Sequence, residues 1–201
     1  MNTILEIPKL PNSIVLEPPL TDEEFEQMSM ANELVKLERT KEGTIVVNPP
    51  TGADSSSGNI EISYQLRAWW KQHRQGKVFD SSAGFFLSDG SSLSPDGAYA
   101  TAEQVRGLSR DDRKHFPHFT PVFVIELLSH SDSLAKAKEK MEVWIANGAR
   151  LGWLIDPYRQ NVIVYEADKA PRLKTGDKVT GTGPVEGFVL DLGPVWSEYE
   201  D

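Results

Sequence analysis

The sequence predicts an α/β (α+β) fold with a mixed β-sheet and few helices, and two observations lead to this prediction. Residues 122–128 (VFVIELL) are a nearly continuous apolar run rich in β-branched residues, typical of a strand covered on both faces. Residues 133–147 carry apolar side chains at helical spacing and end at Gly148, after which residues 151–155 form another apolar run. Strand, helix and strand in this order form a crossover unit.

The elements before this unit are predicted from caps, alternation and turns. Thr21 followed by Glu24 is a capping-box pattern, which predicts a short helix, and residues 33–39 and 44–47 predict a hairpin. After a loop at residues 49–58, the apolar spacing of residues 62–70 predicts an amphipathic helix that ends at Gly76. Short strands are expected at residues 77–80, 83–88 and 98–100, followed by a polar connector at 106–120.

Beyond the crossover unit, residues 161–165 and 188–192 predict two further strands. Residues 169–187 between them are predicted to be loop-rich. We therefore expect an extended arm at residues 1–20, a single domain at residues 21–196 and a short tail at residues 197–201.

Composition excludes several classes of protein. The 201 residues contain 21 Lys and Arg against 30 Asp and Glu, a net charge of −9, so a uniformly basic nucleic-acid-binding surface is ruled out. There is no cysteine, which excludes disulfide scaffolds, thiolate metal sites and cysteine nucleophiles. Residues 1–10 lack a basic segment followed by an apolar one, and the longest apolar run is far shorter than the roughly 20 residues that span a bilayer. We expect a soluble, cytoplasmic protein.

The most informative residue is Glu126, because it lies within the apolar run at residues 122–128. Alternation places it on the same face as Val122 and Val124. A buried ionised carboxylate without a partner costs several kcal/mol or more, so it requires a metal, a cation or a proton. A structural ion pair at the end of a strand satisfies the same requirement, and for a lone acid it is the simpler interpretation.

A second carboxylate, Asp96, follows Ser94-Pro95 at the predicted start of a strand. Two acids on neighbouring strands can share a divalent cation, and their hard oxygen ligands suit Mg²⁺ or Mn²⁺. Pro-Asp is also common turn chemistry. On the helix after the Glu126 strand, Lys140 can reach back to the sheet or pair with neighbouring acids in solvent, and Glu61 can be a favourable charge near a helix N-terminus and nothing more.

Together these residues resemble the PD-(D/E)XK nuclease superfamily, and within it the Uma-two family of predicted restriction endonucleases. The resemblance covers residues 21–196 and implies a restriction-endonuclease-like core. It is carried by six motifs in order: residues 48–52 (NPPTG), 58–62 (GNIEI), 76–82 (GKVFDSS), 94–96 (SPD), 123–127 (FVIEL), and 139–141 (EKM) continuing through 147–148 (NG) to 153–157 (WLIDP).

The resemblance implies a role for each matching residue. Asp96 corresponds to the acid of the Pro-Asp motif and Glu126 to the acid of the E-x-K motif, both metal ligands, and the Leu127 carbonyl is a further candidate ligand. Glu61 is similar to the helix acid that some members add. The sequence departs from the motif at Leu128, where the family scheme has lysine. Lys140 matches a lysine that related sequences carry on the following helix, which implies that it replaces the missing one.

The implied activity is metal-assisted hydrolysis of phosphodiester bonds in DNA, with Mg²⁺ or Mn²⁺ as cofactor. We expect DNA binding to be weak, metal-dependent and sensitive to salt, and a homodimer would present two sites to two strands. Two alternatives stay open. One is a catalytically silent nuclease-like module for binding or assembly, and the other is an enzyme acting on a small phosphoester in a closed pocket.

Overall fold

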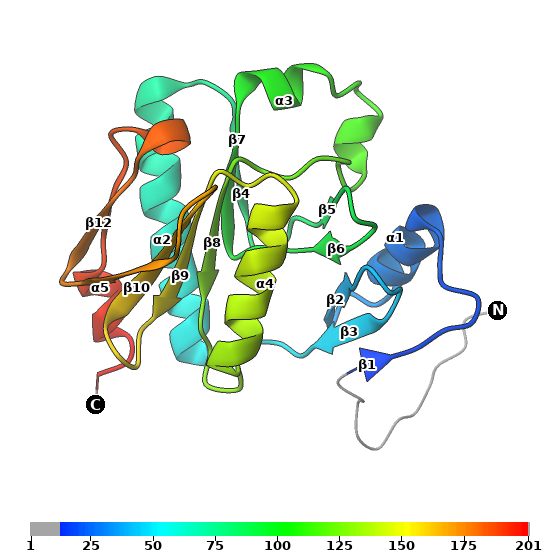
Figure 1. The fold of residues 1–201 in the computed structure, drawn as a ribbon, viewed down its shortest axis with the longest axis horizontal. Coiled ribbons are helices and arrows are strands. Elements are labelled where there is room, and N and C mark those ends of the chain that lie inside the picture. The colour runs from blue at the N-terminus through cyan, green and yellow to red at the C-terminus, as the bar shows by residue number, and fades with distance from the viewer. Residues whose placement is uncertain (1–12, 201) are drawn as a thin grey trace.

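The computed structural model describes residues 13–200, and its centre is a six-stranded mixed sheet (Figure 1). The strand order is β11-β10-β9-β8-β7-β4, and only β8 and β9 run parallel to each other. The predicted fold class is therefore confirmed. In chain order the strands are β4 (Lys77–Asp80), β7 (Gly97–Ala100), β8 (Phe123–Leu127), β9 (Leu151–Asp156), β10 (Asn161–Glu166) and β11 (Arg172–Thr175).

Two helices cover opposite faces of this sheet. The crossover helix α4 (Leu134–Ala146) packs Met141 and Trp144 against Val124 of β8, and it lies in front of the sheet in Figure 1. The long helix α2 (Ala53–His73) packs on the other face, against Phe123 and Ile125. The alternation of side chains along β8 thus divides the interior into two hydrophobic clusters.

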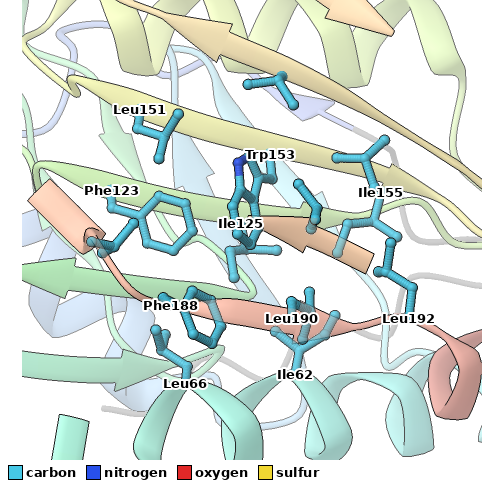
Figure 2. Close-up of a cluster of buried hydrophobic side chains, with 14 of the residues drawn as sticks. Ile62, Leu66, Phe123, Ile125, Leu151, Trp153, Ile155, Phe188, Leu190 and Leu192 are labelled. Carbon is cyan, nitrogen blue, oxygen red and sulfur yellow. The ribbon is translucent and has the colours of Figure 1, made fainter. Parts of the chain in front are cut away.

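The larger cluster lies on the α2 face (Figure 2). Side chains of α2 point toward those of β8 and β9, and the segment containing β13 (Val189–Asp191) fills the space between them. Val122 belongs to this cluster rather than to the Glu126 face, because it precedes the first residue of β8, where regular alternation begins.

A second sheet of five short strands lies beside the central one, and its order is β1-β3-β2-β6-β5. The predicted hairpin is present as β2 (Lys36–Arg39) and β3 (Ile45–Asn48), joined by β1 (Ser13–Ile14), β5 (Phe85–Phe86) and β6 (Ser92–Leu93). Helix α1 (Asp22–Ala31) packs Phe25 into this sheet and begins with the predicted capping box of Thr21 and Glu24.

Two predictions about segments were wrong. Helix α2 begins at Ala53 instead of near Gly58, because Gly58 lies inside the helix as a close-packing position: a Cβ there would lie 3.0 Å from Leu127 Cδ2. The region 169–187, predicted as loops, contains β11 and β12 (Lys178–Thr180), which pairs with β13. All four residues of β11 are exposed, so its polar sequence carries no burial pattern from which a strand could be predicted.

The remaining helical elements are short: α3 (Ala102–Arg106), a 3₁₀ turn at Asp112–Lys114, another at Gly183–Val185, and α5 (Gly193–Ser197). Tyr199, in the predicted tail, packs against the larger cluster and donates a hydrogen bond to Ser55. Most of the predicted arm, residues 1–12, lies outside the described residues. Within residues 13–200, no helix is both long enough and apolar enough to cross a membrane.

Candidate active site

The Ser94-Pro95-Asp96 segment connects β6 of the smaller sheet to β7 of the central sheet, and it is locked against β8. The Asp96 backbone N–H donates to the Ile125 carbonyl at 2.9 Å. The Asp96 Oδ2 accepts a hydrogen bond of 2.8 Å from the Leu127 backbone N–H. Both the main chain and the side chain of Asp96 are therefore fixed beside Glu126.

Glu126 points from β8 toward α4 and is 7% exposed. Trp144 donates its indole N–H to Glu126 Oε1 at 2.8 Å, and Lys140 Nζ lies 2.9 Å from each carboxylate oxygen. Lys140 and Trp144 are four residues apart on α4, so both side chains lie on the same face of the helix and both contact Glu126. The continuous strand–helix unit thus builds this side of the site from residues close in sequence.

Lys140 joins three parts of the chain at its ammonium group. Besides Glu126, Nζ contacts Glu38 Oε1 of β2 at 2.8 Å and donates to the Ser94 carbonyl at 2.9 Å. An ammonium group has three N–H donors, and these three contacts use all of them. Lys140 is consequently held in place from the hairpin, the Pro-Asp segment and β8 together.

Glu38 is the third buried carboxylate of the site, at 7% exposed. Its Oε1 also accepts the Ser94 backbone N–H at 2.9 Å, and its Oε2 accepts the Asn48 side chain at 3.1 Å. These contacts tie the hairpin of the smaller sheet to the segment that carries Asp96.

Two further side chains lie beside Asp96 Oδ1, both at long distances. Lys36 Nζ, from β2, is 3.7 Å away, and Asn59 Nδ2, from α2, is 3.5 Å away. The amide oxygen of Asn59, Oδ1, is buried without a hydrogen-bond partner among the described residues. Asp96 Oδ1 is therefore the most loosely held carboxylate oxygen of the site.

The electrostatics follow from two buried carboxylates sharing one buried ammonium. Burial, opposed by Lys140 and reinforced by the charges of Asp96 and Glu38, raises the pKa of Glu126 to about 7. Burial acts on Glu38 in the same direction, but Lys140, Lys36 and the Ser94 N–H hold its pKa below the ordinary value. Burial alone would lower the pKa of Lys140, yet the three carboxylates raise it, so Lys140 stays charged.

The raised pKa of Glu126 predicts a pH-dependent stability in the absence of divalent cations. Between pH 4.5 and about pH 7, the folded protein keeps a proton on Glu126 that the unfolded chain releases. The contribution of Glu126 to the free energy of unfolding is therefore complete below pH 4.5 and is lost as the pH rises toward 7. Glu126→Gln mimics the protonated form. Its free energy of unfolding relative to the natural protein should rise from near zero at pH 4.5 to about 3 kcal/mol at pH 8. Urea unfolding at several pH values measures this difference, and a difference that does not change with pH would contradict it.

The structure brings Asp96, Glu126 and Lys140 together, and Leu127 joins them by donating its backbone N–H to Asp96 Oδ2. It places Glu61 elsewhere: Glu61 Oε1 accepts from Gln65, which in turn holds the backbone of Asp191, and no hydrogen bond or ion pair within residues 13–200 joins Glu61 to the other predicted site residues. The physical reason is its angular position, because Glu61 follows Asn59 by about 200° around the helix. Asn59 is the α2 side chain that reaches Asp96.

Sequence reasoning missed Glu38, Lys36, Asn59 and Trp144. For Asn59 a signal was available, since it shares a helix face with the buried Ile62 and Leu66 at the spacing i, i+3 and i+7. For the hairpin, alternation places Lys36 and Glu38 on one face opposite Leu37, but a charged face at a functional site has the same pattern as one in solvent.

The residues present fit a divalent cation. Asp96 Oδ1 has only long contacts, Asn59 provides an unpartnered buried oxygen, and three acids outnumber the two lysines beside them. Within residues 13–200, no group of three or more histidine or acidic side chains is arranged to hold a metal by itself. Mg²⁺ does not require such a cage, because it commonly binds one or two carboxylates and keeps waters or substrate phosphates as its other ligands.

The mixed sheet with its Pro-Asp segment, strand acid and nearby lysine is consistent with the restriction-endonuclease-like core that the sequence resemblance implies, and the comparisons with known proteins support this fold. Residues 22–193 match the family model Uma2, described as "Putative restriction endonuclease", and the chain belongs to this family. Among solved structures, it is similar to a "putative nuclease belonging to DUF820" from Anabaena variabilis ATCC 29413. The TM-score is 0.72 at 21% identity, over 90% of this chain and 100% of that one, which shows a shared fold. No curated protein matches the chain.

Proposed function

We propose that this chain is a Mg²⁺- or Mn²⁺-dependent DNA endonuclease in which Asp96 and Glu126 hold the metal and Lys140 takes the place of the missing E-x-K lysine. The observation that carries the proposal is the meeting of Asp96, Glu126 and Lys140 where the Pro-Asp segment is fixed to β8. The description of the family as a "Putative restriction endonuclease" and the fold shared with a structure titled a "putative nuclease" support the same activity.

Asp96 and Glu126 would hold the cation, and the unpartnered side-chain oxygen of Asn59 is available to it or to its waters. The Leu127 carbonyl is a further candidate ligand. The N–H and C=O of one strand residue point toward the same neighbouring strand, and the Leu127 N–H donates a hydrogen bond to Asp96 on that side. A divalent cation supplies Lewis acidity, which polarises a phosphoryl group and makes water a stronger acid.

The chain's own residues prepare this site for charged chemistry. Lys140 and Trp144 fix the orientation of the Glu126 carboxylate, and Lys140 also compensates part of the negative charge that accumulates near the phosphate. Because Glu126 has a pKa of about 7 in the metal-free protein, cation binding should release a proton from it below neutral pH. Metal affinity should therefore increase as the pH rises toward 8.

Cleavage of supercoiled plasmid by the natural protein tests the activity. We expect nicked and linear products with Mg²⁺ or Mn²⁺ and none when a chelator replaces the metal, since two carboxylates alone cannot polarise the phosphate. Gel electrophoresis over a time course measures the rate. Equal cleavage with the chelator would point to a contaminating metal-independent nuclease, and no cleavage by well-folded protein on any nucleic acid would contradict the proposal.

A second candidate is a catalytically silent module with the nuclease fold, and one observation favours it. All three donors of Lys140 and both oxygens of Glu126 are engaged within the protein, so neither is free to act on a substrate without rearrangement. Metal binding without cleavage in the plasmid assay would support this candidate.

A further inference from the structure

The two lysines at the site differ in what they can offer a substrate. Lys140 has no N–H donor left after its contacts with Glu38, Glu126 and Ser94, and its side chain is 21% exposed. Removing any one of these contacts would leave a buried polar group unpaired, which is costly. Lys140 is therefore fixed within the site, where its charge still acts at a distance, and a direct side-chain contact to a substrate phosphate requires another basic residue.

Lys36 has the properties that such a cation needs. It lies on β2 two residues before Glu38, so both side chains leave the strand on the same face and reach the site from the smaller sheet. Its side chain is 33% exposed against 13% for that of Asp96, so Lys36 is the more accessible partner of this pair. Its distance of 3.7 Å from Asp96 Oδ1 exceeds that of a hydrogen bond, so the contact is a loose ion pair.

Other cations near the site are less suited to this role. Arg159 is held by Asp156 at 2.8 Å, and Lys136 and Lys138 are exposed on α4. Within residues 13–200, Lys36 and Lys140 are the only basic side chains in an ion pair with Asp96, Glu126 or Glu38.

We propose that Lys36 is a resident counter-ion of Asp96 that gives up this position to the divalent cation and then binds the phosphate backbone of the substrate. Lys36 and the divalent cation are attracted by the same Oδ1, so each should weaken the binding of the other. Once displaced, the flexible lysine side chain keeps its ammonium group within a few ångströms of the metal, where a substrate phosphate must lie. The first half of this proposal rests on the proposed metal site at Asp96, and the second half rests on the proposed nuclease activity as well.

Lys36→Gln tests the first half through metal binding alone. Calorimetric titration with Mg²⁺ or Mn²⁺ should give about three- to tenfold tighter binding than in the natural protein, because a positive charge close to the cation has been removed. Lys41→Gln is the matched control: it removes the same charge from the same hairpin, but Lys41 is 65% exposed and pairs with Glu42 instead of Asp96. Unchanged or weaker metal affinity in Lys36→Gln, or an equal gain in Lys41→Gln, would overturn the proposal.

The second half is tested by the salt dependence of DNA binding. With Ca²⁺ as the divalent cation and a short duplex, Lys36→Gln should bind less tightly than the natural protein, and its slope of log affinity against log salt should be smaller by about 0.9, equivalent to one phosphate contact. Lys41→Gln should keep the natural slope. An unchanged slope in Lys36→Gln would overturn the phosphate role.

The two failures are distinguishable. If the natural protein cleaves plasmid but Lys36→Gln leaves metal affinity unchanged, only the role of Lys36 is wrong. If Lys36→Gln tightens metal binding but the natural protein neither binds nor cleaves DNA, the nuclease function fails together with the phosphate contact, and the counter-ion role is supported.

Discussion

Glu126→Gln should abolish metal-dependent cleavage and at the same time stabilise the protein. The substitution removes a proposed ligand, so we expect the plasmid cleavage rate to fall by about a thousandfold or more, equivalent to several kcal/mol of lost transition-state stabilisation. Stability should change in the opposite direction at pH 8, because an ionised Glu126 is unfavourable in its buried position without a metal. Cleavage assays and urea unfolding on the same preparation measure both effects.

Glu26→Gln provides the matched control for this experiment. Glu26 is also buried, at 8% exposed, but its carboxylate serves a structural purpose by accepting the Phe116 backbone N–H at 2.7 Å and contacting His115 at 3.1 Å. We expect Glu26→Gln to retain cleavage and to lose stability modestly. Cleavage by Glu126→Gln at the rate of Glu26→Gln would show that Glu126 is not a ligand of the catalytic metal.

Lys140→Met should produce the largest loss of stability. Without this ammonium group, Glu38 and Glu126 remain buried beside each other with no shared counter-charge, and breaking a buried pair in this way typically costs about 3–5 kcal/mol. The loss should be largest at pH 8 and smaller at pH 5, where Glu126 is protonated in the folded protein. Urea unfolding at the two pH values measures the change in the free energy of unfolding.

Two comparisons make this prediction specific. Lys138→Met alters an exposed lysine of the same helix and should change stability little. Adding Glu126→Gln to Lys140→Met should recover part of the loss, because only Glu38 then remains uncompensated. If Lys140→Met were as stable as Lys138→Met at pH 8, the assignment of Lys140 as the buried counter-charge would be wrong.

The sequence was sufficient to predict the elements whose side chains are buried in a regular pattern. The strand–helix–strand unit and α2 carry such patterns, and the structure contains both, although α2 begins at Ala53 rather than near Gly58. Strand β11 could not be found in this way, since it is a fully exposed edge strand whose backbone pairing with β10 is invisible in its side chains. The start of α2 was predicted too late because glycine usually weakens helices. Gly58 instead lies within the helix, where the absence of a side chain allows close packing against Leu127.

The site was predictable only where chemistry is unusual for its position. An acid within an apolar run identifies Glu126, and the family resemblance implies Lys140 as the replacement for the lysine missing at Leu128; its Nζ lies 2.9 Å from Glu126 Oε2. Glu38 could not be identified, because an acid in an alternating hairpin is normally exposed. Its burial depends on how the smaller sheet packs against the Pro-Asp segment, and that contact joins residues 56 positions apart in sequence.

The most direct test of the account compares the natural protein with Asp96→Asn across a range of Mg²⁺ concentrations in the plasmid assay. Asparagine keeps the shape of the side chain and can still accept the Leu127 N–H, so the fold should persist while the cation loses a carboxylate ligand. We expect a cleavage rate that rises with Mg²⁺ and saturates for the natural protein, and little or no cleavage by Asp96→Asn at any Mg²⁺ concentration. Equal, Mg²⁺-dependent rates for the two proteins would contradict it.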